Sequence, residues 1–244
     1  MKVFLAGATG AIGKRLVPLL LEAGFQVVGT TRSSSRAEGL RAPGVEPAVV
    51  DVFDRASLVR AVAAAQPDIV LQQLTDLPPG LDPSQMAEGT RRNARIRSEG
   101  TQNLVAAAQE VGSVSRFIAQ SIAWMYAPGL EPHSEDDRLD VHAQGTRGIT
   151  VTGVATLERS VLALSPIEGI VLRYGHLYGP GTGTDARGEP PSLHVDAAAA
   201  AALLAIARGR SGIYNVAEPS SYLSTEKARS ELGFEAAYRL QTQP

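Results

Sequence analysis

Short apolar runs alternate with amphipathic stretches through the first half of the chain. Each run has the length and apolar content of a buried strand. The runs span residues 3–6, 26–30, 47–50, 69–72 and 116–120. Between them, apolar residues recur at helical spacing, as at Leu58, Val62 and Ala65. This alternation predicts an α/β fold: a doubly wound parallel sheet with helices on both faces.

The second half of the chain is less regular. Five further elements are expected, namely helices at 83–108, 152–164, 197–207 and 225–232 and a strand at 212–216. Asp196 is the expected N-cap of the alanine-rich third helix. Residues 127–146 and 175–191 are rich in glycine, proline or polar residues and are predicted to form loops. Loops that follow strands in such folds carry the ligand sites.

Composition excludes several classes of protein. The chain of 244 residues contains no cysteine and carries a formal net charge of −2. Disulfides and thiolate chemistry are therefore excluded, and no basic surface favours nucleic acid. The chain opens on a strand pattern rather than a signal peptide, and no apolar run reaches the ~18 residues of a membrane span. We expect a cytoplasmic protein that binds neither nucleic acid nor membranes.

Three glycines separate the first predicted strand from the first predicted helix. Backbone amides at a helix N-terminus bind a pyrophosphate when no side chain obstructs its approach. A GxxGxxG sequence between a strand and a helix therefore predicts a dinucleotide-binding loop rather than a purely structural turn. The residues of this loop are Gly7, Thr9, Gly10, Ala11, Ile12 and Gly13.

The end of the second strand bears on which dinucleotide binds. An acidic residue there usually accepts from the ribose hydroxyls of NAD. Here the strand is followed by Thr31, Arg32 and Arg36, and basic side chains suit the 2′-phosphate of NADP. We predict NADP as cofactor, with NAD possible. Asp51, after the third strand, either accepts from the adenine amino group or caps the next turn.

Several motifs occur in an order and spacing that resemble the extended short-chain dehydrogenase/reductase superfamily, in particular its epimerase/dehydratase branch. They are GATGAIG from Gly7, DVFD from Asp51, NARIRSEGTQNL from Asn93, RFIAQSIAWMY from Arg116, LRYGHLYGPGTG from Leu172, HVDAA from His194 and ELGF from Glu231. Beyond the loop and the second strand, the expected cofactor-binding residues also include Val52, Gln73, Leu74, Asn93 and Gln120. Asn93 either hydrogen-bonds backbone near the cofactor or stabilises a helix kink.

The proton relay of that superfamily is missing. The resemblance implies a Tyr-x-x-x-Lys pair on one helix and a Ser or Thr after the fifth strand. Alignment places Thr150 at the tyrosine, Val154 at the lysine and Ile122 at the hydroxyl position. No shift restores the pair, because the chain has no lysine between Lys14 and Lys227. We therefore expect an atypical member of the superfamily.

Other side chains are candidates for acid chemistry. Ser121 and Tyr126 follow the fifth strand, 116–120. Tyr174 and His176 follow a sixth strand, predicted without bounds, which precedes the strand at 212–216. A phenol or imidazole there can protonate a carbonyl oxygen while hydride is delivered. The alternative is that these groups satisfy nearby backbone. His194 and Asp196 suggest a base with its orienting acid, although helix capping explains Asp196 equally well.

No metal site is expected. His133 and His142 lie among acidic residues of the 127–146 stretch, but their spacing fixes no coordination geometry. A solvated acidic loop accounts for them.

These observations predict one domain, 1–244, with a dinucleotide-binding core at 1–173 and a reduced substrate-binding portion at 174–244. The leading hypothesis is an NADP-dependent oxidoreductase acting on a carbonyl-bearing or sugar-like small molecule. Two alternatives stay open: a non-catalytic NADP-binding sensor or scaffold, and a nucleotide-sugar epimerase or dehydratase. The helices at 83–108 and 152–164 carry apolar faces that suit either a homodimer or packing on the sheet.

Overall fold

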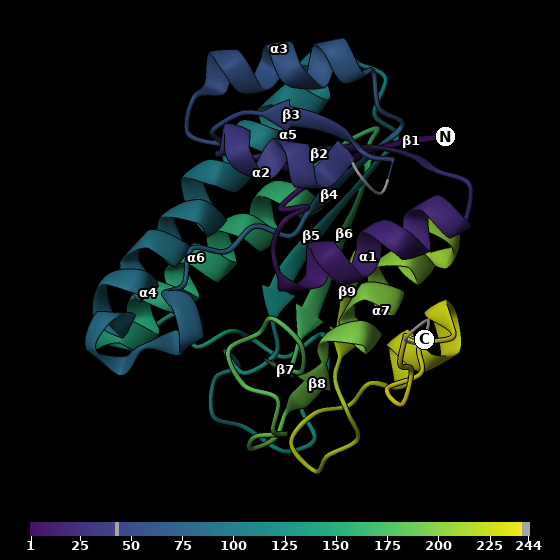
Figure 1. Cartoon of the computed structure of the whole chain (residues 1–244). Helices are drawn as coiled ribbons and strands as arrows, with labels where there is room; N and C mark the ends of the chain where they lie inside the picture. The colour runs from purple at the N-terminus through teal and green to yellow at the C-terminus, as the bar shows by residue number, and fades with distance from the viewer. Residues whose placement is uncertain (42–43, 241–244) are drawn as a thin grey trace.

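The computed structural model describes residues 1–41 and 44–240 and contains a parallel sheet of seven strands in the order β3-β2-β1-β4-β5-β6-β9 (Figure 1). Every pair of neighbouring strands is parallel. The strands are β1 (Lys2–Ala6), β2 (Gln26–Thr31), β3 (Glu46–Val49), β4 (Ile69–Gln72), β5 (Arg116–Ile122), β6 (Glu168–Tyr174) and β9 (Gly212–Val216). The predicted α/β fold and its strands are confirmed.

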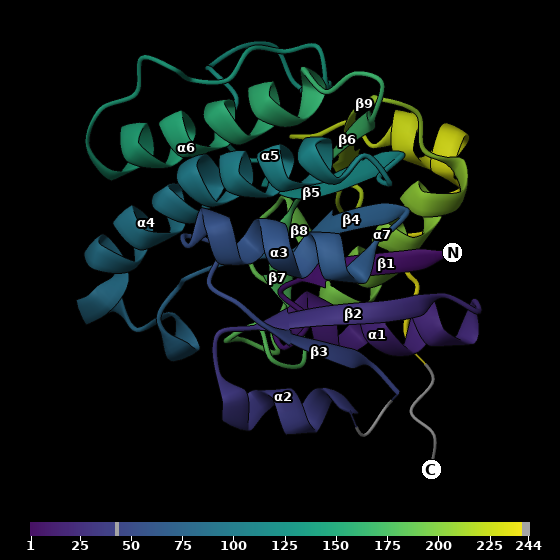
Figure 2. The ribbon, with the colours of Figure 1, turned by 90° about the horizontal axis from the view of Figure 1, so that it is seen from above.

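Helices cover both faces of the sheet, as Figure 2 shows. On one face lie α1 (Ala11–Glu22) and α7 (Val195–Arg208). On the other lie α3 (Arg55–Ala65), α5 (Thr101–Val111) and α6 (Gly145–Leu162). Two more helices flank these layers, with α2 (Ser34–Arg41) against β2 and β3 and α4 (Met86–Arg95) against α6. The pattern analysis did not predict α2, which is short and mostly polar.

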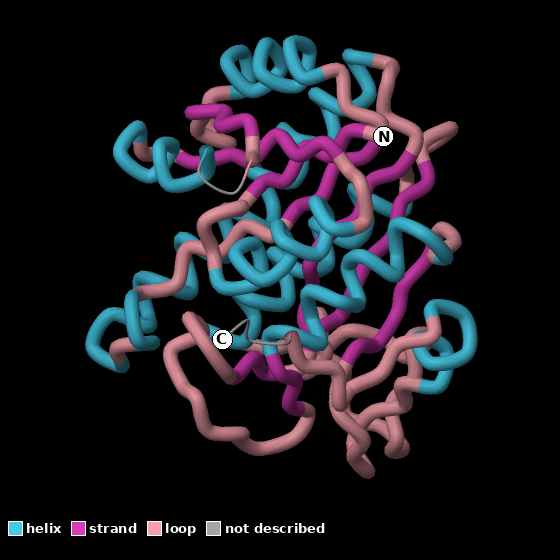
Figure 3. The backbone as a smooth tube through the Cα atoms, turned by 45° about the vertical axis from the view of Figure 1, so that its right-hand side comes forward, coloured by secondary structure: helices cyan, strands magenta, loops and turns pink. Residues whose placement is uncertain are grey.

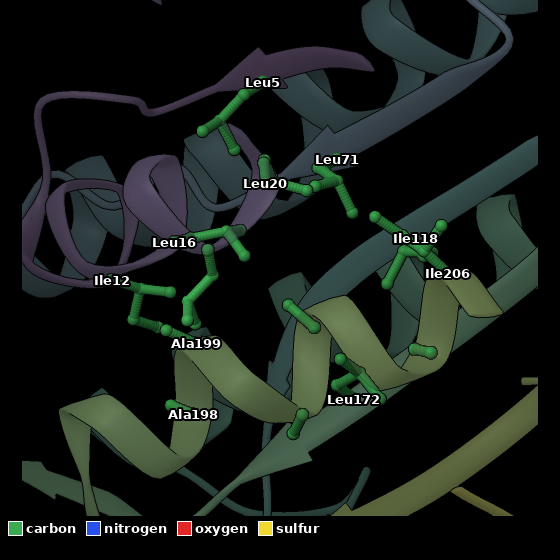
Figure 4. Close-up of a cluster of buried hydrophobic side chains, with 14 of the residues drawn as sticks. Leu5, Ile12, Leu16, Leu20, Leu71, Ile118, Leu172, Ala198, Ala199 and Ile206 are labelled. Carbon is green, nitrogen blue, oxygen red and sulfur yellow. The ribbon is translucent and has the colours of Figure 1, made fainter. Parts of the chain in front are cut away.

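Successive residues of each central strand enter opposite cores. Leu5 packs towards α1 and α7, whereas Phe4 packs towards α3 and α5, and both are fully buried. Figure 4 shows the first core, in which Ala198 and Ala199 of α7 lie among the branched side chains of α1 and the sheet. The small side chains of α7 let the two helices approach closely, which explains why this helix is rich in alanine.

The predicted helix at 83–108 is interrupted. Two 3₁₀ turns, Pro79–Leu81 and Pro83–Gln85, precede α4, and a π turn, η3 (Ile96–Gly100), joins α4 to α5. Helix α5 continues to Val111 and stops at Gly112, which has φ 72°. Helix α6 begins seven residues earlier than predicted, at Gly145. Pro18 does not interrupt α1.

Helix α7 is capped by a different residue from the one predicted. The side chain of His194 accepts a hydrogen bond from the backbone N–H of Asp196. Asp196 instead turns inward, where it accepts from Arg15 and from the backbone of Leu240. The prediction that Asp196 caps the helix is wrong, because tertiary contacts with distant residues use its carboxylate.

Loops gather beyond the carboxyl ends of β5 and β6 (Figure 3). The 175–191 stretch was predicted as loop but begins with β7 (His176–Tyr178), which pairs in parallel with β8 (Ser192–His194). Beyond residue 173, β9 extends the main sheet and η4 (Ala228–Leu232) forms a further π turn. Within residues 1–41 and 44–240, no helix has the length and apolarity needed to cross a membrane. The homodimer through α4 and α6 stays a prediction.

Candidate functional site

The glycine loop joins β1 to α1 at the centre of the sheet. A Cβ at Gly7 would lie 2.6 Å from the carbonyl oxygen of Gln73, and one at Gly13 would lie 2.2 Å from that of Gly7. Both are closer than atoms can pack. These two glycines are therefore required by the protein's own backbone, which corrects the expectation that all three leave space for a ligand.

Gly10 differs from the other two glycines. A Cβ there would lie 3.3 Å from the Gly7 carbonyl oxygen, a tight contact rather than a clash, and Gly10 is exposed. Gly10 is also the N-cap of α1, and no side chain caps this helix. The first-turn N–H groups and the positive end of the helix dipole thus point to a surface that a pyrophosphate can approach.

A cavity of about 170 Å³ opens beside this loop, where β1 lies between β2 and β4. Open α/β sheets bind dinucleotides at this switch in strand order. The predicted residues that line it are Gly7, Thr9, Gly10, Thr31, Arg32, Arg36, Val52, Gln73 and Leu74. Sequence reasoning missed Ser33, Val50 and Thr75, although Val50 ends a predicted strand and the other two follow one closely. Ile12, Gly13 and Asp51 do not line it.

Charged groups at one end of the cavity are mostly basic. The side chain of Arg32 is 56% exposed and lies 3.7 Å from the carboxylate of Asp76, which also lies 3.7 Å from Arg92. Asp76 comes from the segment after β4, so sequence reasoning along β2 missed it. The carboxylate of Asp51 accepts a hydrogen bond from the backbone N–H of Phe53, as expected if it caps the turn.

Gln73 carries an unsatisfied amide in the wall of the cavity. The residue is 4% exposed, and within the described part of the chain its amide makes no hydrogen bond of good geometry, although it lies near enough to the Tyr174 hydroxyl to lower the pKa of that phenol. Buried polar groups without partners are rare. Together with the uncapped helix and the exposed Gly10, this amide fits a site that binds the polar groups of a dinucleotide.

A second, larger cleft of about 740 Å³ adjoins the cavity, and Thr75 lines both. Of the predicted cofactor residues, Ala11, Asn93 and Gln120 line this cleft. The amide oxygen of Asn93 accepts from the backbone N–H of Asp76 at 3.1 Å, one of the two roles considered for it.

The positions of the missing relay also meet in the cleft. Thr150 and Ile122 line it, and Val154 is fully buried on the same helix as Thr150. The Thr150 hydroxyl donates to the carbonyl of Thr146 within α6. The place where the family resemblance implies a tyrosine and a lysine therefore holds neither a phenol nor an ammonium group.

Two of the four acid candidates lie away from the cleft. Ser121 is fully buried and donates to Glu158 at 2.8 Å. The Tyr126 hydroxyl donates to Asn215 at 2.6 Å and accepts from Arg173 at 2.8 Å. Burial raises the pKa of Tyr126 to about 12. Both hydroxyls are engaged in a buried polar network, so we assign neither to catalysis.

Tyr174 and His176 line the cleft, but they differ in what they offer. The Tyr174 hydroxyl donates to the carbonyl of Ala198 at 3.2 Å, on the α7 side, and burial raises its pKa. His176 is exposed and stacks on Trp124 with ring centroids 3.8 Å apart. Desolvation lowers the pKa of His176, so the imidazole is mainly neutral at pH 7.

The histidine and acid pairs found in sequence have structural roles. His133 contacts Asp137 at 3.1 Å, and within the described chain no group of three metal-ligating residues comes together. His194 accepts from the backbone at the start of α7, so its ring serves the helix rather than a reacting group.

The fold and the cavity at the switch in strand order define a Rossmann-type dinucleotide-binding protein with a second cleft beside that cavity. A family model described as NAD(P)H-binding matches residues 7–185, and the chain belongs to this family. A relative, the 3-diazoavenalumate denitrifying reductase of a Streptomyces species, is 39% identical over 241 residues, with 89% of this chain and 76% of the relative covered. An uncharacterised Schizosaccharomyces pombe protein is 44% identical over 63 residues, which cover 26% of this chain and 21% of that protein.

Solved structures share the fold. UDP-glucose 4-epimerase from Thermotoga maritima matches with a TM-score of 0.76 at 20% identity, covering 98% of this chain and 94% of that one. The NAD complex of UDP-glucose 4-epimerase from Thermus thermophilus matches with a TM-score of 0.74 at 20% identity, covering 98% and 95%. The protein is thus an NAD(P)-dependent enzyme with an oxidoreductase-like function and an epimerase-like fold.

Proposed function

We propose that this protein is an NADPH-dependent reductase that delivers hydride to an electrophilic centre of a small organic molecule. The reduced nicotinamide supplies the hydride when bound. The observation that carries the proposal is that the two cavities adjoin, because Thr75 borders both the cofactor cavity and the cleft where a substrate would meet the nicotinamide.

The basic end of the cofactor cavity supports NADP over NAD. Arg32 and Arg36 both line it, and Arg32 has only a long contact with Asp76 to exchange for a phosphate. Guanidinium groups bind phosphates through paired, charge-assisted hydrogen bonds. The NAD-bound epimerases share the fold, which leaves this preference to be measured.

The missing Tyr-x-x-x-Lys pair limits which substrates the protein could reduce. Thr150 and Val154 give no phenol–ammonium relay, so a substrate that needs strong proton donation during hydride transfer suits the cleft poorly. The 39% identical relative is named as a reductase of a diazo compound. We propose that this protein likewise reduces a substrate that accepts hydride without the usual proton relay, and we rank sugar epimerisation below reduction.

The first test is calorimetric titration with NADPH and NADH of the wild type, Arg32→Ala and Arg91→Ala. Arg91 is an exposed arginine of α4 that pairs with Glu88, and it serves as the control. We expect NADPH to bind more tightly and Arg32→Ala to lose about 10- to 100-fold in NADPH affinity, in line with charged hydrogen bonds. Arg91→Ala should match the wild type. Tighter binding of NADH would contradict the NADP assignment.

Turnover separates a reductase from a sensor. Diazo, quinone and carbonyl compounds are offered with NADPH, and oxidation of the nicotinamide is followed by its absorbance together with formation of the reduced product. Oxidation of NADPH coupled to reduction of any of them supports the proposal. Tight NADPH binding without NADPH oxidation in the presence of any compound would favour the non-catalytic alternative.

A further inference from the structure

Arg97 is a buried cation in the wall of the substrate cleft. It lies on the π turn η3, is 8% exposed and lines the cleft. Between residues 1 and 41 and between 44 and 240, no acid forms an ion pair with its guanidinium, and no group accepts a hydrogen bond from it. Burial lowers the pKa of Arg97 to about 10, an effect partly offset by attraction to Glu158, so the side chain remains charged at pH 7.

The nearby acid is already engaged. Glu158 accepts two hydrogen bonds from Arg173, at 2.8 and 2.7 Å, and a third from Ser121 at 2.8 Å. The charges of Glu158 and Arg173 cancel, and Arg97 leaves one positive charge without a partner. An unpaired buried charge is costly to the fold. Ionisable groups with strongly perturbed pKa values cluster at functional sites.

Besides Arg97, the cleft is lined by polar side chains such as Asn93 and Gln120, by the exposed acid Glu189 and by one flat, apolar patch. Trp124 and His176 stack with an interplanar angle of 22° and line the cleft together with Leu77, Leu81 and Met86. A ligand that fits these walls has a planar apolar body, and the guanidinium can bind an anionic group at one end of it.

We propose that Arg97 binds the carboxylate of a flat, mono-anionic substrate whose body lies against Trp124 and His176. This inference rests on the proposed reductase function and names its substrate class. A carboxylate matches the guanidinium with two parallel hydrogen bonds and neutralises its charge. A ribose hydroxyl of the cofactor could accept hydrogen bonds from the Arg97 guanidinium but would not neutralise its positive charge.

The test uses simple acids and their uncharged amides as probes. Benzoate, cinnamate, benzamide and cinnamamide are titrated into the NADPH-saturated wild type, Arg97→Gln, Arg97→Lys and Arg91→Gln. We expect the wild type to bind at least one acid about 10- to 100-fold more tightly than its amide. Arg97→Gln should abolish this preference, Arg97→Lys should retain part of it and Arg91→Gln should retain all of it. NADPH affinity of Arg97→Gln should stay within about twofold of wild type.

Thermal melting of the ligand-free proteins adds a second readout. Arg97→Gln removes an unpaired buried charge, so its Tm should be at or above that of the wild type. A clear fall would show that Arg97 supports the fold and would overturn the inference.

Three further outcomes of the titrations would overturn the inference, and one would contradict the proposed function. The inference is overturned if no acid binds the wild type more tightly than its amide, or if Arg97→Gln keeps the preference. It is also overturned if Arg97→Gln weakens NADPH binding as much as it weakens acid binding, because Arg97 would then hold the cofactor. A wild type that fails to bind NADPH contradicts the proposed function itself.

Discussion

At the scale of single residues, buried polar side chains of two strands and a helix form one network around Tyr126. Arg173 of β6 links Glu158 of α6 to Tyr126, and Tyr126 in turn binds Asn215 of β9. Each member satisfies another, which is the condition under which buried polar groups do not destabilise a fold. The network therefore ties β6, β9 and α6 together and leaves the chemistry to other residues.

Tyr126→Phe tests this structural role. The change leaves the Asn215 amide oxygen and an Arg173 N–H without their partner, and we expect the free energy of unfolding to fall by about 1 to 3 kcal/mol. NADPH affinity should not change, because Tyr126 lines neither cavity. Urea unfolding and calorimetry measure the two quantities.

The control is Tyr222→Phe. Tyr222 is partly exposed and packs edge-on against His133. Loss of its hydroxyl should change stability by about 0.5 kcal/mol or less. Equal losses in both variants, or a loss of NADPH binding in Tyr126→Phe alone, would contradict the assignment.

At the scale of elements, the three glycines of the turn from β1 into α1 are equivalent in the sequence motif but have different roles in the structure. Gly7 and Gly13 permit backbone to approach backbone, whereas Gly10 keeps the helix N-terminus open to a ligand. The sequence predicted the loop and its ligand from the strand–helix context. It could not divide the roles, because the division depends on the distance of each Cα from β4 and from the loop itself.

Substitution by alanine separates these roles. Gly13→Ala places a Cβ 2.2 Å from the Gly7 carbonyl oxygen, so we expect it to fold poorly or to lose several kcal/mol of stability. Gly10→Ala has a contact of 3.3 Å and should fold, yet bind NADPH at least about tenfold more weakly. Circular dichroism and calorimetry report the two effects. A Gly10→Ala protein with wild-type affinity would show that the pyrophosphate lies elsewhere.

At the scale of the whole molecule, the stability of the fold depends on a histidine that must stay neutral. His194 caps α7, which covers one face of the sheet, and its Nδ1 accepts from a backbone N–H at 3.2 Å. Desolvation, with Arg239 and Arg15 nearby, lowers the pKa of His194. The unfolded chain binds this proton near its ordinary pKa of about 6.5, before the folded protein does. Stability from this group is thus present above about pH 6.5 and is lost as pH falls through the lower folded pKa.

His194→Asn removes the titration while keeping a side chain that caps helices well. We expect the wild type to lose more stability than His194→Asn between pH 7.5 and 5.5, as measured by urea unfolding at each pH. His142→Gln alters an exposed histidine and should follow the wild type. Identical pH dependence in the wild type and His194→Asn would exclude His194 as the responsible group.

The sequence by itself determined the α/β class, the positions of six of the seven strands and the dinucleotide loop, because these depend on local periodicity and on glycines between a strand and a helix. It also determined that no lysine is available for the usual relay. Where the polar side chains act was decided by the tertiary structure. Ser121, predicted to follow the fifth strand, lies within β5, and Tyr126 follows it, yet Glu158, Arg173 and Asn215 bind both side chains in the core. In the sequence, Arg97 is one of several arginines in a predicted helix, and nothing local distinguishes it. In the structure it lies on the π turn beside the cleft, buried and without an ion-pair partner among the described residues. Burial and pairing depend on residues far apart in the chain, so the sequence could not predict them.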